Sequence, residues 1–363
     1  MHYRRVCLES FGYALPEEIV TTAELERRLA PLYERLRLPE GRLELMTGIR
    51  ERRFFPPGTR PSTVSIQSAR KAIVASGIDP RQFGALIHGS VCRDFLEPAT
   101  ACRVHHGLEL PADAMIYDVS NACLGVLNGM VQVANMIELG QIRAGIVVGT
   151  ECGRELIDNT IDQLNGDPSL TRESVKHSIA SLTIGSASVA VVLCDEELSQ
   201  TGNRLTAAMV HCDTSQHDLC QSRGLEKLMQ TDSEELMRRG IAAGLETFGR
   251  FLAAAGWEPD DIDRTFCHQV GVAHRKLMFE SLGLDPAIDF ATLETLGNTG
   301  AAALPVTMAV GIEQGRLRRG DRVAMLGIGS GINCLMLAAE WRSAGARSSR
   351  KEFGQSSLAG ASG

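Results

Sequence analysis

Positive charge is scarce in this chain of 363 residues, in which 37 lysines and arginines stand against 44 aspartates and glutamates, for a formal net charge of −7. A dedicated nucleic-acid-binding protein needs a basic surplus to neutralise phosphates, so the sequence argues against that class. The sequence also lacks a run of about 18 apolar residues, and we therefore expect no membrane span. Met1–Ala14 has no long apolar core and contains Glu9, which argues against a secretory signal and favours a cytoplasmic location.

Paired cysteine motifs are absent too, although the chain contains ten cysteines. Without a Cys-x-x-Cys pair or a tight framework, we expect reduced and mostly buried cysteines rather than disulfides. The stretch His211–Cys220 contains two histidines and two cysteines, but their spacing matches no common zinc site. The sequence therefore predicts no bound metal and at most one or two cysteines with a chemical role.

Strand-like and helix-like segments alternate along nearly the whole chain, which is typical of an α/β protein with buried strands. The expected strands include Ala85–His88, Ala144–Val148, Ser188–Leu193 and Arg322–Leu326. The expected helices include Thr63–Ala75, Leu124–Leu139, Ser233–Ala255 and Ala303–Gln314. The helix from Leu124 is apolar on almost every side, so we expect it to be buried all round.

A weak internal repeat divides the chain into two parts. A glycine-containing turn followed by an apolar strand occurs at Gly77 and again at Gly256, 179 positions later. A second pair of glycines, both at strand ends, has a nearly equal spacing of 178 positions. Two strand–helix units with one spacing predict a duplicated α/β fold. We place the N-terminal half at 1–195 and the C-terminal half at 196–341.

Two stretches depart from this alternation. Gly153–Lys227 is polar with long connections, so we expect an insert that begins at about 153 and serves either as a substrate lid or as decoration. The segment 342–363 is rich in serine, glycine and alanine and cannot bury enough apolar surface to order itself. We therefore expect a disordered tail.

The strongest chemical signal surrounds Cys123. In the sequence Asp118-Val-Ser-Asn-Ala-Cys123-Leu-Gly, a strand ends, a tight turn holds the cysteine, and the apolar helix begins directly after it. A thiol at a helix N-terminus lies at the positive end of the helix dipole, which favours the thiolate. Cys123 is therefore a candidate nucleophile, and the alternative is a buried structural cysteine.

Two further signals lie in the second half. His268 follows an apolar strand in Phe266-Cys-His268-Gln, and Asn298 sits between glycines before a helix of small residues. Each alone is more often a hydrogen-bonded polar residue or a turn. Together with Cys123 they provide a nucleophile and two neutral hydrogen-bonding groups, a set suited to covalent acyl transfer.

These motifs resemble the thiolase superfamily, and within it the condensing enzymes of the ketoacyl-ACP synthase III type, over about residues 3–341. Phe11–Glu17 and Thr47–Arg52 resemble N-terminal signatures of that family. The resemblance implies a thiolase fold, a duplicated five-layer αβαβα architecture. It also places Cys123, His268 and Asn298 on the Cys–His–Asn triad of the family.

The resemblance further implies an oxyanion hole. The glycine loop Gly327-Ile-Gly-Ser-Gly331 matches that of the family, and its backbone near Gly331 would join the Cys123 N–H in holding a negative oxygen. Thiolases proper have a second catalytic cysteine late in the chain, and Cys334 does not lie at a matching motif. Asn298 also argues against that branch.

Glu97 narrows the resemblance to one branch. In Val91-Cys-Arg-Asp-Phe-Leu-Glu97-Pro, the glutamate stands where the synthase III branch usually has phenylalanine, and the pattern is similar to the head-to-head acyl-CoA condensing enzymes of olefin synthesis, the OleA type. In that family the glutamate reaches into the acyl tunnel of the partner subunit. A carboxylate in an apolar tunnel has a raised pKa and is suited to remove an α-proton. The alternative is an exposed loop carboxylate.

A departure from the synthase III pattern points the same way. That branch continues His-Gln-Ala-Asn-x-Arg, whereas this chain has Gly271 in place of the asparagine, and its arginine is displaced to Arg275. Because those two residues help to hold the carrier protein in the branch, a malonyl-ACP partner is in doubt.

We therefore expect a cytoplasmic homodimeric acyltransferase that joins two fatty acyl-CoA molecules without decarboxylation, through an acyl-cysteine, to give a 2-alkyl-3-ketoacyl-CoA. Acyl-CoA is then the substrate, no cofactor is needed, and downstream pathway enzymes are possible partners. One alternative is a decarboxylative ketoacyl-ACP synthase III or a Cys-dependent acyltransferase of a fatty-acid or natural-product pathway. Another is a non-catalytic scaffold subunit that only lends Glu97 to a partner.

Overall fold

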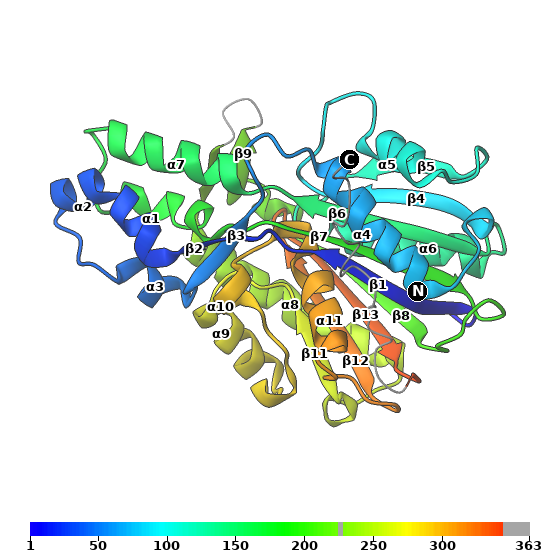
Figure 1. The fold of residues 1–363 in the computed structure, drawn as a ribbon. Helices are drawn as coiled ribbons and strands as arrows, with labels where there is room; N and C mark the ends of the chain where they lie inside the picture. The colour runs from blue at the N-terminus through cyan, green and yellow to red at the C-terminus, as the bar shows by residue number, and fades with distance from the viewer. Residues whose placement is uncertain (224–227, 344–363) are drawn as a thin grey trace, which may run out of the picture.

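The computed structural model describes residues 1–223 and 228–343, and in these residues nine strands form one mixed sheet (Figure 1). Their order is β11-β12-β13-β8-β1-β7-β6-β4-β5. The strands are β1 (Val6–Ala14), β4 (Phe83–Gly89), β5 (Met115–Val119), β6 (Ala144–Glu151), β7 (Ala187–Asp195), β8 (Arg204–Cys212), β11 (Arg264–Cys267), β12 (Arg322–Gly329) and β13 (Asn333–Glu340). Two small hairpins pair β2 (Glu18–Thr21) with β3 (Glu51–Phe54) and β9 (Cys220–Arg223) with β10 (Leu228–Thr231).

Helices cover both outer faces of the sheet, and α6 and α11 lie between its two parts. The helices are α1 (Thr22–Arg28), α2 (Ala30–Leu36), α3 (Arg42–Thr47), α4 (Pro61–Ser76), α5 (Thr100–Leu108), α6 (Gly125–Glu138), α7 (Arg154–Gly166), α8 (Ser233–Ala255), α9 (Val272–Leu282), α10 (Leu293–Leu296) and α11 (Ala303–Glu313). In Figure 1, α1, α2, α3 and α7 gather at the left, where one hydrophobic cluster joins them.

Three hydrophobic clusters define five layers. The central cluster packs α6 and α11 between the two parts of the sheet, with Ile87 and Val147 on one side and Val323 and Leu337 on the other. A second cluster packs α4 and α5 on the outer face of the first part, and a third packs α8 and α9 on the outer face of the second. This arrangement confirms the predicted five-layer αβαβα architecture.

The central position of α6 follows from its composition. Ten of its 14 residues are buried, so the helix is buried over most of its surface as predicted, although Gln132 and the predicted last residue, Leu139, are exposed. Burying one aliphatic side chain contributes about 1.5–3 kcal/mol to the free energy of folding. The apolar residues of α6 together therefore stabilise the fold strongly. They also hold the N-terminus of the helix, and with it Cys123, in one position.

The strand pairing confirms the predicted duplication. The pairing β4-β6-β7-β1, parallel and then twice antiparallel, recurs in β11-β12-β13-β8. The helix before each first strand ends in the same way, at Gly77 (φ 65°) after α4 and at Gly256 (φ 68°) after α8. A left-handed backbone at this position favours glycine. The division of the chain into 1–195 and 196–341 stays a prediction, although it falls between the end of β7 and the start of β8.

The expected insert is smaller than predicted. The segment Gly153–Lys227 is not one lid or decoration, because β7 and β8 lie within it and are two of the inner strands of the sheet. The parts that depart from the repeat are α7 with the 3-10 turns at Ser174–Thr183, and the β9–β10 hairpin. β7 contains the strand expected at Ser188–Leu193, whereas β8 was not among the expected strands. Of the expected disordered tail, 344–363 lies outside the described residues.

The backbones of β4 and α6 are in contact at two glycines, Gly89 at the end of β4 and Gly125 at the start of α6. A Cβ at Gly89 would lie 2.4 Å from the Gly125 carbonyl oxygen, and a Cβ at Gly125 would lie 2.8 Å from the Gly89 carbonyl carbon. Both atoms are backbone, so neither can yield easily. This contact sets how closely the Cys123 region approaches the sheet.

We predict that Gly89→Ala lowers the free energy of unfolding by about 1–3 kcal/mol, because the new methyl group must push α6 away from β4. Urea denaturation followed by circular dichroism measures the loss. Gly166→Ala is the matched control, since a Cβ there meets nothing within 4 Å. Equal stability of the two variants would contradict the prediction.

No helix among the described residues is long and apolar enough to cross a membrane.

Candidate active site

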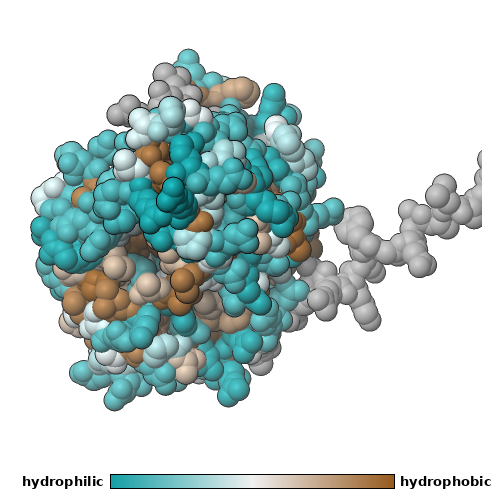
Figure 2. All heavy atoms as spheres, turned by 90° about the vertical axis from the view of Figure 1, so that its left-hand side faces the viewer, coloured by the Kyte–Doolittle hydropathy of each residue, from teal (hydrophilic) through white to brown (hydrophobic). Residues whose placement is uncertain are grey.

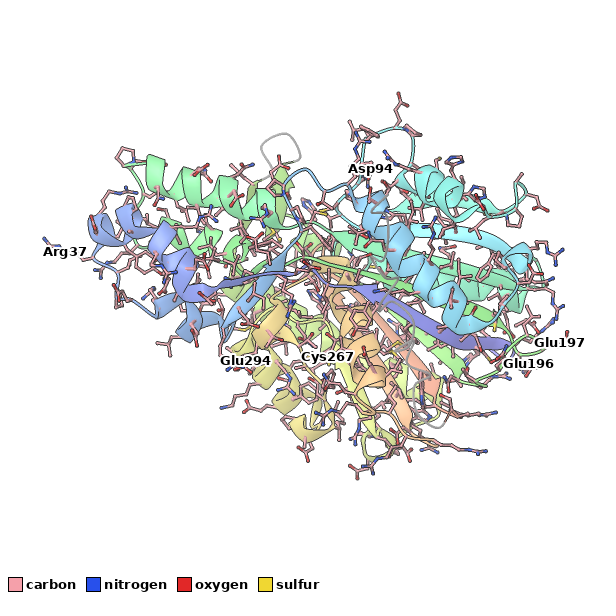
Figure 3. All side chains as sticks on the ribbon, in the orientation of Figure 1. Arg37, Asp94, Glu196, Glu197, Cys267 and Glu294 are labelled. Carbon is pink, nitrogen blue, oxygen red and sulfur yellow. The ribbon has the colours of Figure 1, made fainter. Side chains whose placement is uncertain are left out.

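The chemistry-bearing residues lie at the carboxyl ends of parallel strands. β4, β5 and β6 run parallel in one part of the sheet, and β11 and β12 run parallel in the other. Cys123 follows β5, His268 follows β11 directly, and a glutamate that the sequence did not single out, Glu151, ends β6. Figure 3 shows Cys267, the residue before His268, in the middle of the molecule. In an open α/β sheet, ligands bind at such strand ends.

Cys123 lies in a tight turn between β5 and α6. Ala122 has a φ of 44°, a left-handed conformation that costs a residue with a side chain about 1–3 kcal/mol. The Leu124 N–H donates to the Asn121 carbonyl oxygen at 2.9 Å and closes the turn. The strained residue directly before the cysteine is the kind of backbone outlier that clusters at active sites.

The predicted glycine loop contacts this turn. A Cβ on Gly329 would lie 3.6 Å from the Cys123 nitrogen, so the end of β12 passes beside the cysteine. After Gly329 the chain turns, and Asn333 donates from Nδ2 to the Ser330 carbonyl oxygen and to Asn121 Oδ1, both at 3.1 Å. The side-chain bond across 212 positions therefore joins the turn that contains Gly331 to the turn that contains Cys123.

Burial opposes the predicted activation of Cys123. Its surroundings raise the pKa of the thiol to about 12, first by desolvation and then by the negative charge of Glu151, with a smaller contribution from Cys220. The expectation that the helix N-terminus would favour the thiolate is therefore wrong for the resting protein. In this state Cys123 is a neutral thiol.

This pKa predicts how Cys123 reacts with iodoacetamide. Only the thiolate reacts, so the rate should rise about tenfold per pH unit from pH 7 to pH 9 without a plateau. Mass spectrometry of the Cys123 peptide measures that rate. A thiol whose pKa lay near 7 would instead give a rate that levels off above pH 8, and such a profile contradicts the prediction.

His268 is buried, with only 6% of its surface exposed, and its Nδ1 has no hydrogen-bond partner among residues 1–223 and 228–343. Its backbone N–H donates to the Leu326 carbonyl oxygen at 3.1 Å, which continues the pairing of β11 with β12. Burial, followed by the nearby His274, lowers the pKa of His268 to about 3. The imidazole is therefore neutral and suited to donate or accept a hydrogen bond.

Asn298 lies in a tight turn that is tied to the rest of the protein through its backbone. Its N–H donates to the Thr183 carbonyl oxygen, and its own carbonyl oxygen accepts from the Gly185 N–H, both at 2.9 Å. Its side-chain Oδ1 accepts from the Gly300 N–H at 3.0 Å. Asn298 is thus fixed in a buried position.

In the described residues, no hydrogen bond joins the side chains of Cys123, His268 and Asn298 to one another. Catalytic hydrogen bonds tighten when substrate binds. Their common position follows from contacts between the segments that carry them: β11 pairs with β12, and β12 passes Cys123.

Glu97 lies elsewhere, in the loop 90–99 between β4 and α5, which we call the Glu97 loop. Figure 3 shows Asp94 of this loop at the upper edge of the molecule. The tip is exposed and apolar, with Phe95 50% and Leu96 91% accessible, and Glu97 is also exposed. Within one chain the structure leaves Glu97 outside the buried site.

The base of the Glu97 loop is nevertheless firmly held. Asp94 accepts from the Ser62 N–H at 2.9 Å and from the Ser62 hydroxyl at 2.6 Å. At the other end, Asp118 of β5 accepts from the N–H groups of Thr100 and Ala101, both at 2.8 Å. The loop is therefore a rigid support with an apolar tip rather than a loose connection.

Glu151 is the functional residue that the sequence analysis missed. It is 5% exposed, lies at the end of β6, and its charge acts on Cys123. Burial raises its pKa, while bonds from backbone N–H groups and the Cys92 thiol oppose the shift. The signal was present in the sequence, because a carboxylate three positions after the apolar run Ile146–Val148 is rare in a buried strand.

A groove of about 750 Å³ opens beside the His268 loop. It is lined by α3, the start of α9 and the residues near α10, among them Leu45, Gly48, Arg50, Val272 and Glu294. Figure 2 looks onto the end of the molecule formed by α1, α2, α3 and α7, where hydrophobic patches lie among hydrophilic side chains. A concave, partly apolar surface next to a reactive centre is typical of a substrate entrance.

The displaced arginine of the sequence motif has a structural partner. Arg275 Nε lies 2.6 Å from Asp289 Oδ2, a carboxylate whose side chain is fully buried.

Among the described residues, no group of three or more histidines, cysteines, aspartates or glutamates is placed to hold a metal ion.

The comparisons with known proteins agree with this geometry. An acyl-CoA:acyl-CoA alkyltransferase from Shewanella oneidensis is 45% identical over 352 residues, which cover 94% of this chain and all of the relative. The chain belongs to this family of thiolase-fold condensing enzymes. A second alkyltransferase, from Xanthomonas campestris, is 34% identical over 341 residues. A β-ketoacyl-ACP synthase III from Symbiobacterium thermophilum is 28% identical over 348 residues, so the similarity to that branch is lower.

Family models match both parts of the chain. Residues 58–160 match the thiolase N-terminal domain, and residues 252–341 match the C-terminal region of 3-oxoacyl-ACP synthase III. Crystal structures of OleA from Xanthomonas campestris align with a TM-score of 0.90, at 33% identity over 94% of this chain and 98% of theirs. These matches confirm the thiolase fold and the class, an acyltransferase that forms carbon–carbon bonds.

Several of those OleA crystal structures are of variants. They substitute one glutamate, one cysteine or one histidine, and one structure of a cysteine variant contains lauric acid and lauroyl-CoA. In that protein the substituted glutamate precedes the substituted cysteine by the same number of positions that separates Glu97 from Cys123.

Proposed function

We propose that this protein condenses two fatty acyl-CoA molecules head to head into a 2-alkyl-3-ketoacyl-CoA. The observation that carries the proposal is the set of a partly buried Cys123 and a buried His268 and Asn298, together with a glutamate at the spacing found in OleA. The lauroyl-CoA bound to that relative, and the acyl-CoA substrates named for the alkyltransferases, support acyl-CoA as the substrate here.

In the first half of the reaction, the Cys123 sulfur attacks the carbonyl carbon of one acyl-CoA. The carbon–sulfur bond to coenzyme A breaks, and coenzyme A leaves as a thiol that takes up the proton lost by Cys123. The backbone N–H groups of Cys123 and Gly331 would stabilise the oxyanion during this attack. The product of this half is a thioester between the acyl group and Cys123.

In the second half, a second acyl-CoA enters and Glu97 removes its α-proton. Neutral His268 and Asn298 donate hydrogen bonds to the enolate oxygen, which lowers the cost of forming the carbanion. The carbanion attacks the acyl-Cys123 carbonyl, the Cys123 sulfur leaves, and the proton held by Glu97 returns to it. The balance needs no metal, redox cofactor or decarboxylation, and we place the product in olefin biosynthesis.

We also propose a homodimer in which Glu97 serves the site of the partner subunit. Within one chain Glu97 is exposed while Cys123 has a densely packed environment, so Glu97 needs a second chain to act on substrate. The exposed apolar tip of the Glu97 loop and the exposed Met115 on the edge strand β5 support an interface there. A cytoplasmic location stays a prediction from the sequence.

Incubation of the purified protein with myristoyl-CoA alone tests this function. Mass spectrometry should detect the branched β-keto product, or the ketone formed when water hydrolyses its thioester and the resulting β-keto acid loses carbon dioxide. A parallel reaction with malonyl-CoA or malonyl-ACP serves as the comparison. Product formed only with malonyl thioester would overturn the head-to-head assignment in favour of a decarboxylative synthase III.

A further inference from the structure

The carboxylate of Glu151 joins three segments that are far apart in the sequence. Its Oε1 accepts from the Val91 N–H at 3.0 Å and from the Ala301 N–H at 3.3 Å, and its Oε2 accepts from the Cys92 N–H at 3.2 Å. Val91 and Cys92 begin the Glu97 loop, 60 and 59 positions before Glu151. Ala301 lies 150 positions after it, three residues beyond Asn298.

The fit around this carboxylate is tight. A Cβ at Gly300 would lie 3.0 Å from Glu151 Cγ and 3.1 Å from its Cδ, so the Asn298 turn packs directly on the side chain. Gly300 is also the residue whose N–H binds Asn298 Oδ1. A shift of Glu151 would therefore move the hydrogen bond that orients the Asn298 amide.

We propose that Glu151 is a positioning residue for condensation, because its carboxylate holds the base of the Glu97 loop and the Asn298 turn at fixed positions beside Cys123. The inference rests on the function proposed above, since both tethered segments act in its second half. It assigns to Glu151 no contact with substrate. The positions of the Glu97 carboxylate, which removes the α-proton, and of the Asn298 amide, which binds the enolate, therefore both depend on the Glu151 side chain.

A carboxylate suits this position better than an amide. Three N–H donors face its two oxygens, and a glutamine would direct an NH₂ group at one or two of those donors. The titratable groups that feel its charge include the thiols of Cys92, Cys152 and Cys123, and the pKa of each is raised in part by Glu151. Removing the charge while keeping the shape should therefore ease ionisation of Cys123.

Glu151→Gln consequently has two effects of opposite sign. Alkylation of Cys123 by iodoacetamide at pH 7.5 should become at least about threefold faster, which corresponds to a pKa about half a unit lower. Condensation of preformed acyl-enzyme with myristoyl-CoA should slow about tenfold or more, because the Glu97 loop and the Asn298 turn lose their common anchor. General damage to the fold would not speed alkylation and slow condensation together in a protein that keeps its thermal transition.

Glu9→Gln is the matched control. Glu9 is also 5% exposed and accepts from the Ser199 hydroxyl at 2.6 Å and the Gln200 N–H at 3.1 Å, but it lies on β1 near Cys7 and Cys194. Its substitution should change neither rate by more than about twofold. Any effect shared by both variants reports stability rather than positioning.

Glu151→Asp provides the second arm if the glutamine variant does not fold. It keeps the charge but is one methylene shorter, so alkylation should match the wild type while condensation slows. Wild-type condensation in either variant overturns the inference. Wild-type protein that yields no head-to-head product contradicts the proposed function instead, and the two failures are thereby distinguished.

Discussion

Cys123→Ala is expected to abolish condensation of myristoyl-CoA, by about 10⁴-fold or more. The proposed reaction has a covalent acyl-enzyme in every turnover, and the rest of the site cannot replace a missing nucleophile. Intact-protein mass spectrometry should show an added myristoyl group on the wild type and none on the variant. Release of coenzyme A should fall in parallel.

Cys102→Ala is the control for this experiment. Cys102 is also partly buried, but it lies on α5 and has no role in the proposed chemistry. It should retain wild-type acylation and turnover. Acylation of the Cys123→Ala protein at another cysteine, with turnover preserved, would show that Cys123 is structural, the alternative that the sequence left open.

Glu97→Ala should separate the two halves of the reaction. Acylation of Cys123 needs no α-proton removal, so the variant should release about one equivalent of coenzyme A per chain and then stop as acyl-enzyme. Condensation should fall by about 10²–10⁴-fold, the usual contribution of a positioned general base. A burst assay with a thiol reagent, paired with mass spectrometry of the protein, measures both quantities.

A mixed dimer tests whether Glu97 acts on the partner subunit. Neither Glu97→Ala nor Cys123→Ala alone can condense, but a dimer with one chain of each kind has one site with both Cys123 and Glu97. Co-expression with two different affinity tags should therefore restore a substantial share of the activity. Mixed dimers that stay inactive, while both variants bind acyl-CoA, would place Glu97 in the site of its own chain.

The rival functions make different predictions for the same variants. A decarboxylative synthase III would be indifferent to Glu97→Ala and dependent on malonyl thioester. A scaffold subunit would show no acyl group on Cys123 in the wild type. The family relationship and the presence of Cys123, His268 and Asn298 favour the head-to-head condensation over both.

Much of the fold was predictable because its signals are local. The apolar runs predicted β4, β6, β7 and β12, and the αL glycines Gly77 and Gly256 marked the ends of α4 and α8 in both repeats. The expected extent of the insert, a lid or decoration over Gly153–Lys227, was wrong for the opposite reason, because β8 gave no clear local signal and only its pairing with β13 places it inside the sheet.

The same distinction between local and tertiary signals applies to the active site. The sequence alone determined that Cys123 follows a strand and precedes a buried helix, and it placed His268 after a strand and Asn298 in a glycine-flanked turn before a helix, since such features depend on a few neighbouring residues. Only the tertiary structure decided the ionisation of Cys123, because desolvation and the charge of Glu151 come from residues distant in sequence and outweigh the helix N-terminus. Tertiary structure also gave Glu151 its three partners and left Glu97 exposed on its own chain, because burial and hydrogen bonding across 60 and 150 positions are products of packing.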